Sequence, residues 1–140
     1  MSEKVIVEAD GGARGNPGPA GYGAVVIDAS TGQVLVEALG GLGVTTNNVA
    51  EYQGLIAGLR AAQERGAREV DVRLDSKLLV EQMSGRWKIK HPGLRQLASE
   101  AAELVRSFDT VSFSWIPRAQ NSRADKLANK AMDTQAQAGR

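Results

Sequence analysis

The spacing of apolar and polar residues predicts a run of strands before the first helix. Apolar stretches rich in valine and isoleucine occupy 4–10, 22–28 and 33–41, and turns rich in glycine, proline and serine separate them. Strands joined by such short turns pair as an antiparallel meander. The nearly continuous apolar character of 4–10 further predicts a central position in the sheet.

Helical spacing begins at Asn47, where apolar residues recur every three or four positions, and we expect this first helix to end at Gly66. The pattern then predicts a strand at 69–75, a short helix from 76, a helix over 94–105, a strand at 110–116 and a last helix from Asn121 or Ser122. This order predicts one α/β domain. Its five-stranded mixed sheet would join the meander to two parallel strands, with helices flanking the sheet.

Four acidic residues lie where strands end or helices begin. They are Asp10, Glu51, Asp75 and Asp125. A helix separates the strands that carry Asp10 and Asp75, so we expect these strands to be parallel neighbours whose carboxyl ends meet at one edge of the sheet. Helix starts reach the same edge, and the four carboxylates would then share one cleft.

Each acid also has a purely structural explanation. Asp10 fits a turn, Asp75 an N-cap, Glu51 the first turn of a helix, and Asp125 a capping box with Ser122. These explanations hold for one residue at a time. They do not account for four acids at one edge of the sheet.

Converging carboxylates repel one another unless some are protonated or cations bind among them. The sequence has no cysteine and one histidine, which excludes thiolate zinc sites and leaves oxygen ligands for hard ions such as Mg²⁺ or Mn²⁺. Two such ions about 3.5–4 Å apart are a known arrangement for phosphodiester cleavage. The acids therefore favour phosphoryl chemistry.

Competing motifs are incomplete in this sequence. The stretch GGLGVTTN at 40–47 lacks the third glycine of a dinucleotide fingerprint, and no Gly-Lys-Ser/Thr marks a P-loop. His91 precedes Pro92 without an evident serine or aspartate partner, so a hydrolytic triad has no support.

A basic segment lies at 84–95. It contains no acid, and its charged or aromatic residues are Arg86, Trp87, Lys88, Lys90, His91 and Arg95. One interpretation is a solvated loop whose Trp87 covers the edge of the core. The other is a contact with a nucleic-acid backbone, whose phosphates attract lysine and arginine. Without the four acids above, 12 acidic residues face 17 basic ones, which favours a polyanionic partner.

The chain ends and the hydropathy give the remaining expectations. The start MSEKVIVEAD reaches an acid before a signal-peptide core forms, and no apolar run approaches membrane-spanning length. We therefore expect a cytoplasmic protein that does not contact a membrane. We also expect a monomer, with a domain over 1–135 and a disordered tail or the start of a linker at 136–140.

Four segments resemble ribonuclease H type 1. They are DGGARGNPGPAGYG at 10–23, TTNNVAEY at 45–52, LDSKLLVEQ at 74–82 and WIPRAQNSRADKLAN at 115–129. They follow the family's order over nearly the whole chain. The resemblance implies the ribonuclease H-like fold and an endoribonuclease that cuts the RNA strand of RNA/DNA hybrids without strong sequence specificity.

The same resemblance implies roles for individual residues. Two Mg²⁺ ions, or Mn²⁺ in their place, would be held by Asp10, Glu51, Asp75 and Asp125. Cleavage would leave 5′-phosphate and 3′-hydroxyl ends. The minor groove of the hybrid would face Asn16, Asn47 and Asn48, and a DNA phosphate would meet Thr46.

The sequence departs from the family at two places. Many members carry a histidine in the loop before the last acid, but PRAQNSRAD has none. Either Arg118 or Gln120 takes its place or the step proceeds without it, and we assign the catalytic role to Arg118. The segment 85–93 is short against the family's basic protrusion, and its replacements would be Arg86, Trp87, Lys88 and Lys90. Lys77 stands where several members have glutamine, which makes double-stranded RNA a second candidate substrate.

Two alternative functions stay open. One is a module that binds hybrid or double-stranded RNA without cutting it, as the missing histidine suggests; against it, like charges facing a polyanion do not help a pure binder. The other is a different nuclease of the superfamily, such as a junction resolvase. The pair Asn47 and Asn48 and the Gly-Asn-Pro-Gly turn argue against that alternative.

Overall fold

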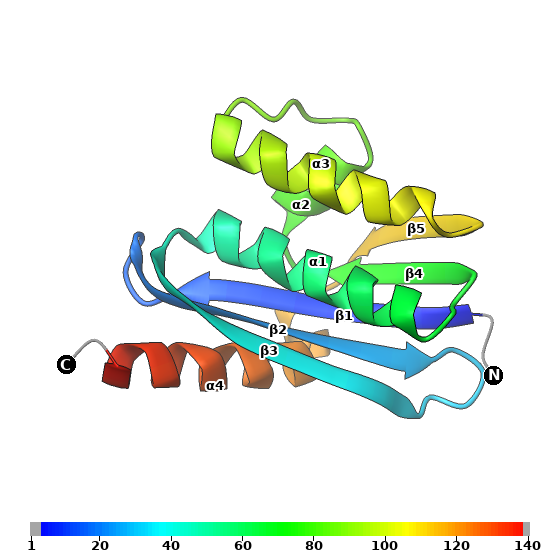
Figure 1. The fold of residues 1–140 in the computed structure, drawn as a ribbon, viewed down its shortest axis with the longest axis horizontal. Helices are drawn as coiled ribbons and strands as arrows, with labels where there is room; N and C mark the ends of the chain where they lie inside the picture. The colour runs from blue at the N-terminus through cyan, green and yellow to red at the C-terminus, as the bar shows by residue number, and fades with distance from the viewer. Residues whose placement is uncertain (1–3, 139–140) are drawn as a thin grey trace.

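The computed structural model describes residues 4–138, and its elements follow the predicted order with one added 3₁₀ turn. They are β1 (Lys4–Ala13), β2 (Gly18–Asp28), β3 (Val34–Thr45), α1 (Asn47–Glu64), β4 (Glu69–Leu74), α2 (Lys77–Met83), α3 (Pro92–Arg106), β5 (Thr110–Trp115), η1 (Arg118–Gln120) and α4 (Ser122–Ala138). Each predicted strand and helix is therefore present. Figure 1 shows their arrangement.

One five-stranded sheet runs through the molecule in the order β3-β2-β1-β4-β5. β1 pairs antiparallel with β2, and β2 with β3, which confirms the predicted meander. β1 pairs in parallel with β4, and β4 with β5. The mixed sheet with a central first strand is thus confirmed.

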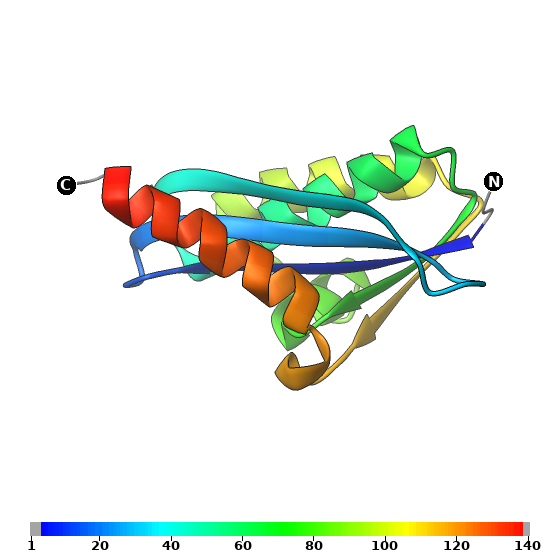
Figure 2. The ribbon, with the colours of Figure 1, turned by 90° about the horizontal axis from the view of Figure 1, so that it is seen from below.

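Helices cover both faces of the sheet. α1 and α3 lie on one face, and α4 crosses the other, as the two views in Figures 1 and 2 show. α1 packs on β1 and β2, α3 packs on α1, and α4 packs on β1, β2 and β3. The sheet is therefore the middle of three layers.

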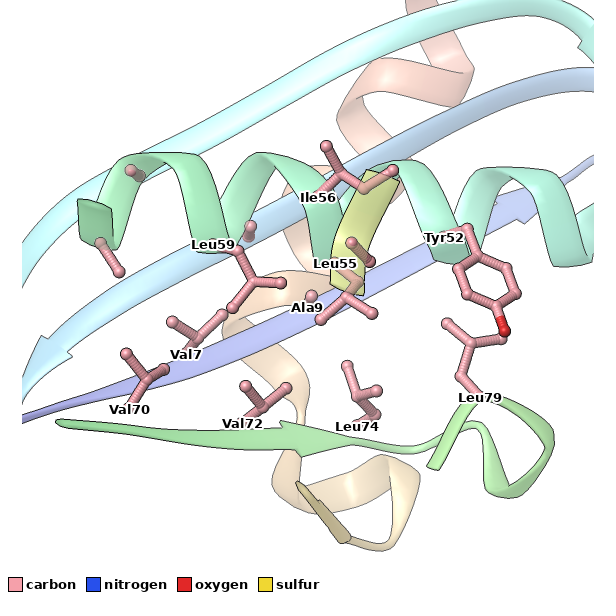
Figure 3. Packing of buried hydrophobic residues seen from close by; sticks show 14 of the residues in the cluster. Val7, Ala9, Tyr52, Leu55, Ile56, Leu59, Val70, Val72, Leu74 and Leu79 are labelled. Atoms are coloured by element: carbon pink, nitrogen blue, oxygen red, sulfur yellow. The ribbon is translucent and has the colours of Figure 1, made fainter. Parts of the chain in front are cut away.

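The core lies between α1 and the sheet. Figure 3 shows Leu55 and Leu59 of α1 above Val7, Val72 and Leu74 of the strands. All five are buried, and each such side chain contributes about 1.5–3 kcal/mol by leaving water. This packing fixes α1 against β1, which carries the first of the four acids.

Helix ends and caps follow the sequence signals. Gly66 has a left-handed φ of 77° just past the end of α1, as predicted for a C′ residue. The N-cap of α2 is Ser76 and not Asp75, since the Ser76 Oγ accepts the Leu79 N–H at 3.3 Å. Asp75 is thereby left for another role.

The meander strands are longer than predicted. We expected β1 to end at Asp10, but it continues to Ala13, which pairs with Ala20 of β2. Similarly, β2 begins at Gly18, which pairs with Thr45 of β3. Glycine and proline signal a turn, whereas here they also stand in extended ladder positions. Asp10 therefore lies within β1 rather than at its end.

The final helix runs to Ala138, so residues 136–138 of the expected tail are helical, and 139–140 lie outside the described residues. The extent of the domain stays a prediction. None of the helices in the described part of the chain is long and apolar enough to cross a membrane.

Candidate active site

A cleft of about 540 Å³ opens at one edge of the sheet, and all four predicted acids line it. The other polar side chains along it are Arg14, Asn16, Asn47, Asn48, Arg118 and Asn129. The structure thus brings together carboxylates that are as far apart in sequence as Asp10 and Asp125. It also places three of the predicted nucleic-acid residues beside them.

The parallel ladder positions the first two acids. Ala9 and Leu74 are the last paired residues of β1 and β4, and Asp10 and Asp75 follow them directly. Beyond this point β4 stops, while β1 stays paired with β2. The two carboxylates therefore lie side by side at the point where β4 ends.

Glycines let the two helices approach these strands. A Cβ on Gly11 would lie 2.2 Å from the Ala50 carbonyl carbon and 2.5 Å from the Glu51 nitrogen, so only glycine permits this contact with α1. On the other face, a Cβ on Gly23 would lie 2.5 Å from the Ala124 oxygen of α4. Close approach on both faces carries Glu51 and Asp125 into the cleft.

Burial and mutual repulsion raise the pKa values of two of the four acids. The pKa of Asp10 rises from 3.8 to about 8, first because burial disfavours its charge, then because of the charge of Asp75 and a hydrogen bond with Asp125. The pKa of Glu51 rises to about 7 by burial and by the charge of Asp75, against a hydrogen bond from Ser76. Both carboxyls are therefore costly to ionise in the absence of a cation.

The cleft fits a divalent cation. Glu51 Oε2 is buried and has no hydrogen-bond partner among the described residues, so its lone pairs are available to a metal ion. The donors are oxygens, which suits Mg²⁺ or Mn²⁺. Within residues 4–138 no three acidic or histidine side chains stand close enough to form a ready-made ligand set for one ion. Closer convergence requires positive charge, because unneutralised carboxylates repel.

Asn16 and Asn47 are tied to each other at the cleft wall. Asn47 Oδ1 accepts the Ala13 N–H at 2.8 Å, and Asn16 Oδ1 accepts the Asn47 N–H at 3.1 Å. Thr46 is the N-cap of α1, and its Oγ1 accepts the Val49 N–H at 3.3 Å. The β1–β2 turn and the start of α1 thus form one rigid surface.

Arg118 lies in η1 at the rim of the cleft. Its Nη2 is 3.5 Å from Asp125 Oδ1, and its side chain is 79% exposed. The guanidinium of Arg118 offers positive charge and hydrogen-bond donors at the rim of the cleft. Its place beside an acid of the cleft agrees with the predicted location, and its catalytic role stays a prediction.

The basic segment lies outside the cleft and is held to the protein by its backbone. The Lys88 carbonyl accepts from Gln82 Nε2 at 3.5 Å, and the Ile89 carbonyl from Arg95 Nε at 2.6 Å. Arg86 is already paired, with its Nε 2.5 Å from Glu81 Oε2. Lys88, Lys90 and Lys77 are exposed.

Trp87 is the aromatic residue of the basic segment, and it is 46% exposed. The apolar residues of this segment that belong to the core or pack against it are Leu94 and Ile89. This weakens the interpretation of Trp87 as a core-covering side chain. Its contact with nucleic acid stays a prediction.

Sequence reasoning missed three residues near the acids. Asn121, considered only as a helix start, is fully buried behind the cleft, and Trp115 donates its Nε1–H to the Asp75 carbonyl at 3.1 Å. Arg14 lines the cleft and forms an ion pair with Asp133 of α4. No local signal marked Asn121, because its neighbours Gln120 and Ser122 are also polar and its partners Ala9 and Asp75 lie far away in sequence.

Comparisons with known proteins give the relatives of this chain. A family model described as reverse transcriptase-like matches residues 8–131. The bifunctional protein Rv2228c of Mycobacterium tuberculosis is 59% identical over 134 residues, which cover 96% of this chain and 37% of that protein. The chain thus spans about a third of the length of this relative. Ribonuclease HI of Halobacterium salinarum is 44% identical over 89% of this chain and 62% of its own length.

Other relatives are matched over most of their length. Ribonuclease H of Rhizobium meliloti is 34% identical, with 92% of this chain and 90% of that protein covered. Among solved structures, the N-terminal RNase H domain of Rv2228c, fused to maltose-binding protein, superposes with a TM-score of 0.97 at 57% identity, covering 99% of this chain and 100% of that one. LC11-RNase H1 in complex with an RNA/DNA hybrid gives 0.87 at 44% identity, covering 93% and 97%.

Proposed function

Because the chain belongs to the ribonuclease H type 1 family, we propose that it is an endoribonuclease that hydrolyses the RNA strand of RNA/DNA hybrids. The observation that carries this proposal is the convergence of four carboxylates in a cleft beside amide side chains. The hybrid bound to LC11-RNase H1 supports the choice of substrate. A monomer in the cytoplasm is part of the same proposal.

The acids of the cleft are proposed to hold two Mg²⁺ ions, for which Mn²⁺ substitutes. These acids are Asp10, Glu51, Asp75 and Asp125. When bound, the ions supply acidity to the attacking water and charge stabilisation to the leaving 3′ oxygen, which gives 5′-phosphate and 3′-hydroxyl ends. The unpartnered Glu51 Oε2 and the raised pKa values of Asp10 and Glu51 support this assignment, because both costs disappear when a cation binds.

Two amides suit a minor groove. Asn16 and Asn47 use their Oδ1 atoms within the protein, so each keeps its Nδ2 hydrogens for donation. The minor groove presents acceptors at every base pair, and the RNA strand adds its 2′-hydroxyls. Donors of this kind, with Asn48 beside them, recognise the hybrid by shape and sugar rather than by base sequence. Thr46 is proposed to meet a phosphate of the DNA strand.

The remaining predicted contacts are basic or aromatic. We assign Arg118 to stabilising charge at the reacting phosphate, since it stands 3.5 Å from Asp125. The DNA backbone is proposed to lie over Arg86, Trp87, Lys88 and Lys90, with less weight on Arg86 because of its ion pair with Glu81. Lys77, exposed at the start of α2, is proposed to admit double-stranded RNA as a weaker substrate.

The test is cleavage of an end-labelled RNA/DNA hybrid by the wild type and by Asp75→Asn, with Mg²⁺, Mn²⁺ or EDTA. We expect metal-dependent cutting of the RNA strand, lost in the variant while hybrid binding persists. Double-stranded RNA and double-stranded DNA are the matched substrates. Binding without cutting in either metal would overturn the proposal in favour of a binding module, and cutting of double-stranded DNA or a four-way junction would favour a different nuclease.

A further inference from the structure

A buried amide stands directly behind the acids. Asn121 is 0% exposed and follows η1, one residue before α4 begins. Its Nδ2 donates to the Ala9 carbonyl at 2.9 Å and to Asp75 Oδ2 at 3.2 Å. Figure 2 shows the start of α4 beside the ends of β4 and β5.

This one residue links three of the elements that carry the acids. Ala9 is the residue before Asp10 in β1, and Asp75 directly follows Leu74, the last residue of β4. On the α4 side, the Asn121 carbonyl accepts the Asp125 N–H at 3.0 Å. The relative positions of three carboxylates therefore depend on contacts with a single side chain and its own backbone.

The chemistry of the two partners fixes the orientation of the amide. The Ala9 carbonyl and the Asp75 carboxylate both accept hydrogen bonds, so the donating nitrogen has to face them. The Asn121 Oδ1 is then turned away, and it is buried without a partner among the described residues.

Asp75 is held from a second direction. Trp115 donates to its main-chain carbonyl at 3.1 Å, while Asn121 holds one carboxylate oxygen. Neither bond uses Asp75 Oδ1. Restraint at Oδ2 and at the backbone leaves Oδ1 as the oxygen of Asp75 that is free to bind a cation in the cleft.

We infer that Asn121 is a positioning residue that sets the divalent-ion affinity of the cleft by holding Asp75 in register with Asp10 and Asp125. This rests on the proposed function only in that the cleft binds a divalent ion. Hydrogen-bond partners of metal-ligating carboxylates typically contribute 10–100-fold to metal affinity. The amide makes no contact with substrate in this assignment, so it acts through Asp75.

The experiment is Mn²⁺ titration by calorimetry, without nucleic acid, of the wild type, Asn121→Ala and Gln82→Leu. Gln82 is the matched control because it is the other buried polar side chain in the described part of the chain, and it bonds to Tyr52 Oη at 2.7 Å rather than to an acid. We expect Mn²⁺ affinity to fall about tenfold in Asn121→Ala and to stay at the wild-type value in Gln82→Leu. Raising Mg²⁺ should restore most of the turnover of Asn121→Ala, with the KM for the hybrid unchanged at saturating metal.

Wild-type Mn²⁺ affinity in folded Asn121→Ala would overturn the inference. So would an equal loss in Gln82→Leu, since that would indicate general destabilisation. Where circular dichroism shows Asn121→Ala to be unfolded, Asn121→Ser takes its place with the same expected and overturning results. A wild type that binds Mn²⁺ but does not cut hybrids would overturn the proposed function alone, and unaltered Mn²⁺ affinity in an active variant would overturn the inference alone.

Discussion

Asp10 and Asp75 are the residues that follow the last parallel pair of β1 and β4, so two carboxylates stand beside each other where no backbone ladder separates them. Burial and the charge of Asp75 raise the pKa of Asp10 to about 8. The backbone pairing that stabilises the sheet thus enforces an electrostatic conflict at its edge. A bound divalent cation would neutralise this repulsion. In the metal-free protein the repulsion should be measurable as a change of stability with pH.

The metal-free protein should become less stable as pH rises. A carboxyl with a raised pKa in the folded state holds its proton where the unfolded chain has already lost it. The folded state then binds more protons between pH 3.8, the ordinary pKa of Asp10, and about 8, so the free energy of unfolding falls through that window. In EDTA, urea titrations from pH 5 to pH 9 should show a loss of more than ~1 kcal/mol. Mg²⁺ at pH 9 should restore it by binding the folded state.

Asp10→Asn is the control for that prediction. It removes the group with the largest shift, so the slope against pH should flatten. Glu51, with a pKa of about 7, and Glu8, whose pKa is raised by burial, would leave a residual slope. A wild-type stability that is flat or rises with pH in EDTA would contradict the prediction.

Gly11→Ala should destabilise the protein and impair cleavage. The new Cβ would lie 2.2 Å from the Ala50 carbonyl carbon and oxygen, which are backbone atoms of α1. The helix has to shift, and Glu51 shifts with it, at a cost of about 1–3 kcal/mol. Gly12→Ala is the matched control, because its Cβ would meet the Met132 side chain at 3.4 Å, an ordinary contact. Equal free energies of unfolding for the two variants would refute this account.

The topology and the acids of the cleft were predictable from the sequence because each depends on local pattern. Alternation and helical spacing predicted each strand and helix, and the crossover rule made β1 and β4 parallel neighbours. The positions at which strands end were harder to predict. β1 passes Asp10 because β2 pairs with it as far as Ala13, and the glycines there signal a turn and fit a ladder equally well.

Residues that act across the sheet left no such pattern. The Asn121 side chain donates to the main-chain carbonyl of Ala9 in β1 and to the carboxylate of Asp75 just after β4, and no spacing in the sequence relates these partners. Pairing also changes what composition suggests. Arg86 counts as a cation of the basic segment. Its ion pair with Glu81, however, leaves little net charge at this one side chain to attract a phosphate.

Arg118→Ala should lower turnover at saturating Mg²⁺ without abolishing it. The guanidinium is 79% exposed and 3.5 Å from Asp125, so its removal costs little stability but takes positive charge from the rim of the cleft. We expect a drop in kcat of about tenfold or more, which is smaller than the roughly 100- to 1,000-fold loss typical of a buried donor because Arg118 is exposed. Arg118→Lys should recover part of the lost turnover, because lysine also supplies positive charge at this position. Unchanged turnover in Arg118→Ala would remove this residue from the reaction.

Replacing Lys88 and Lys90 together by alanine should weaken hybrid binding and its dependence on salt. Both lysines are exposed, and the carbonyls of Lys88 and Ile89 are held by Gln82 and Arg95, so the segment presents its charge from a fixed backbone. Each phosphate contact contributes about 0.7–0.9 to the slope of log affinity against log salt, so the double variant should lose up to ~2 from that slope. Fluorescence anisotropy with the cleavage-deficient Asp75→Asn background in EDTA measures binding alone. Arg86→Ala should change the slope less, since Glu81 already neutralises that guanidinium. An unchanged slope in the double variant would show that this segment is a solvated loop rather than part of the substrate surface.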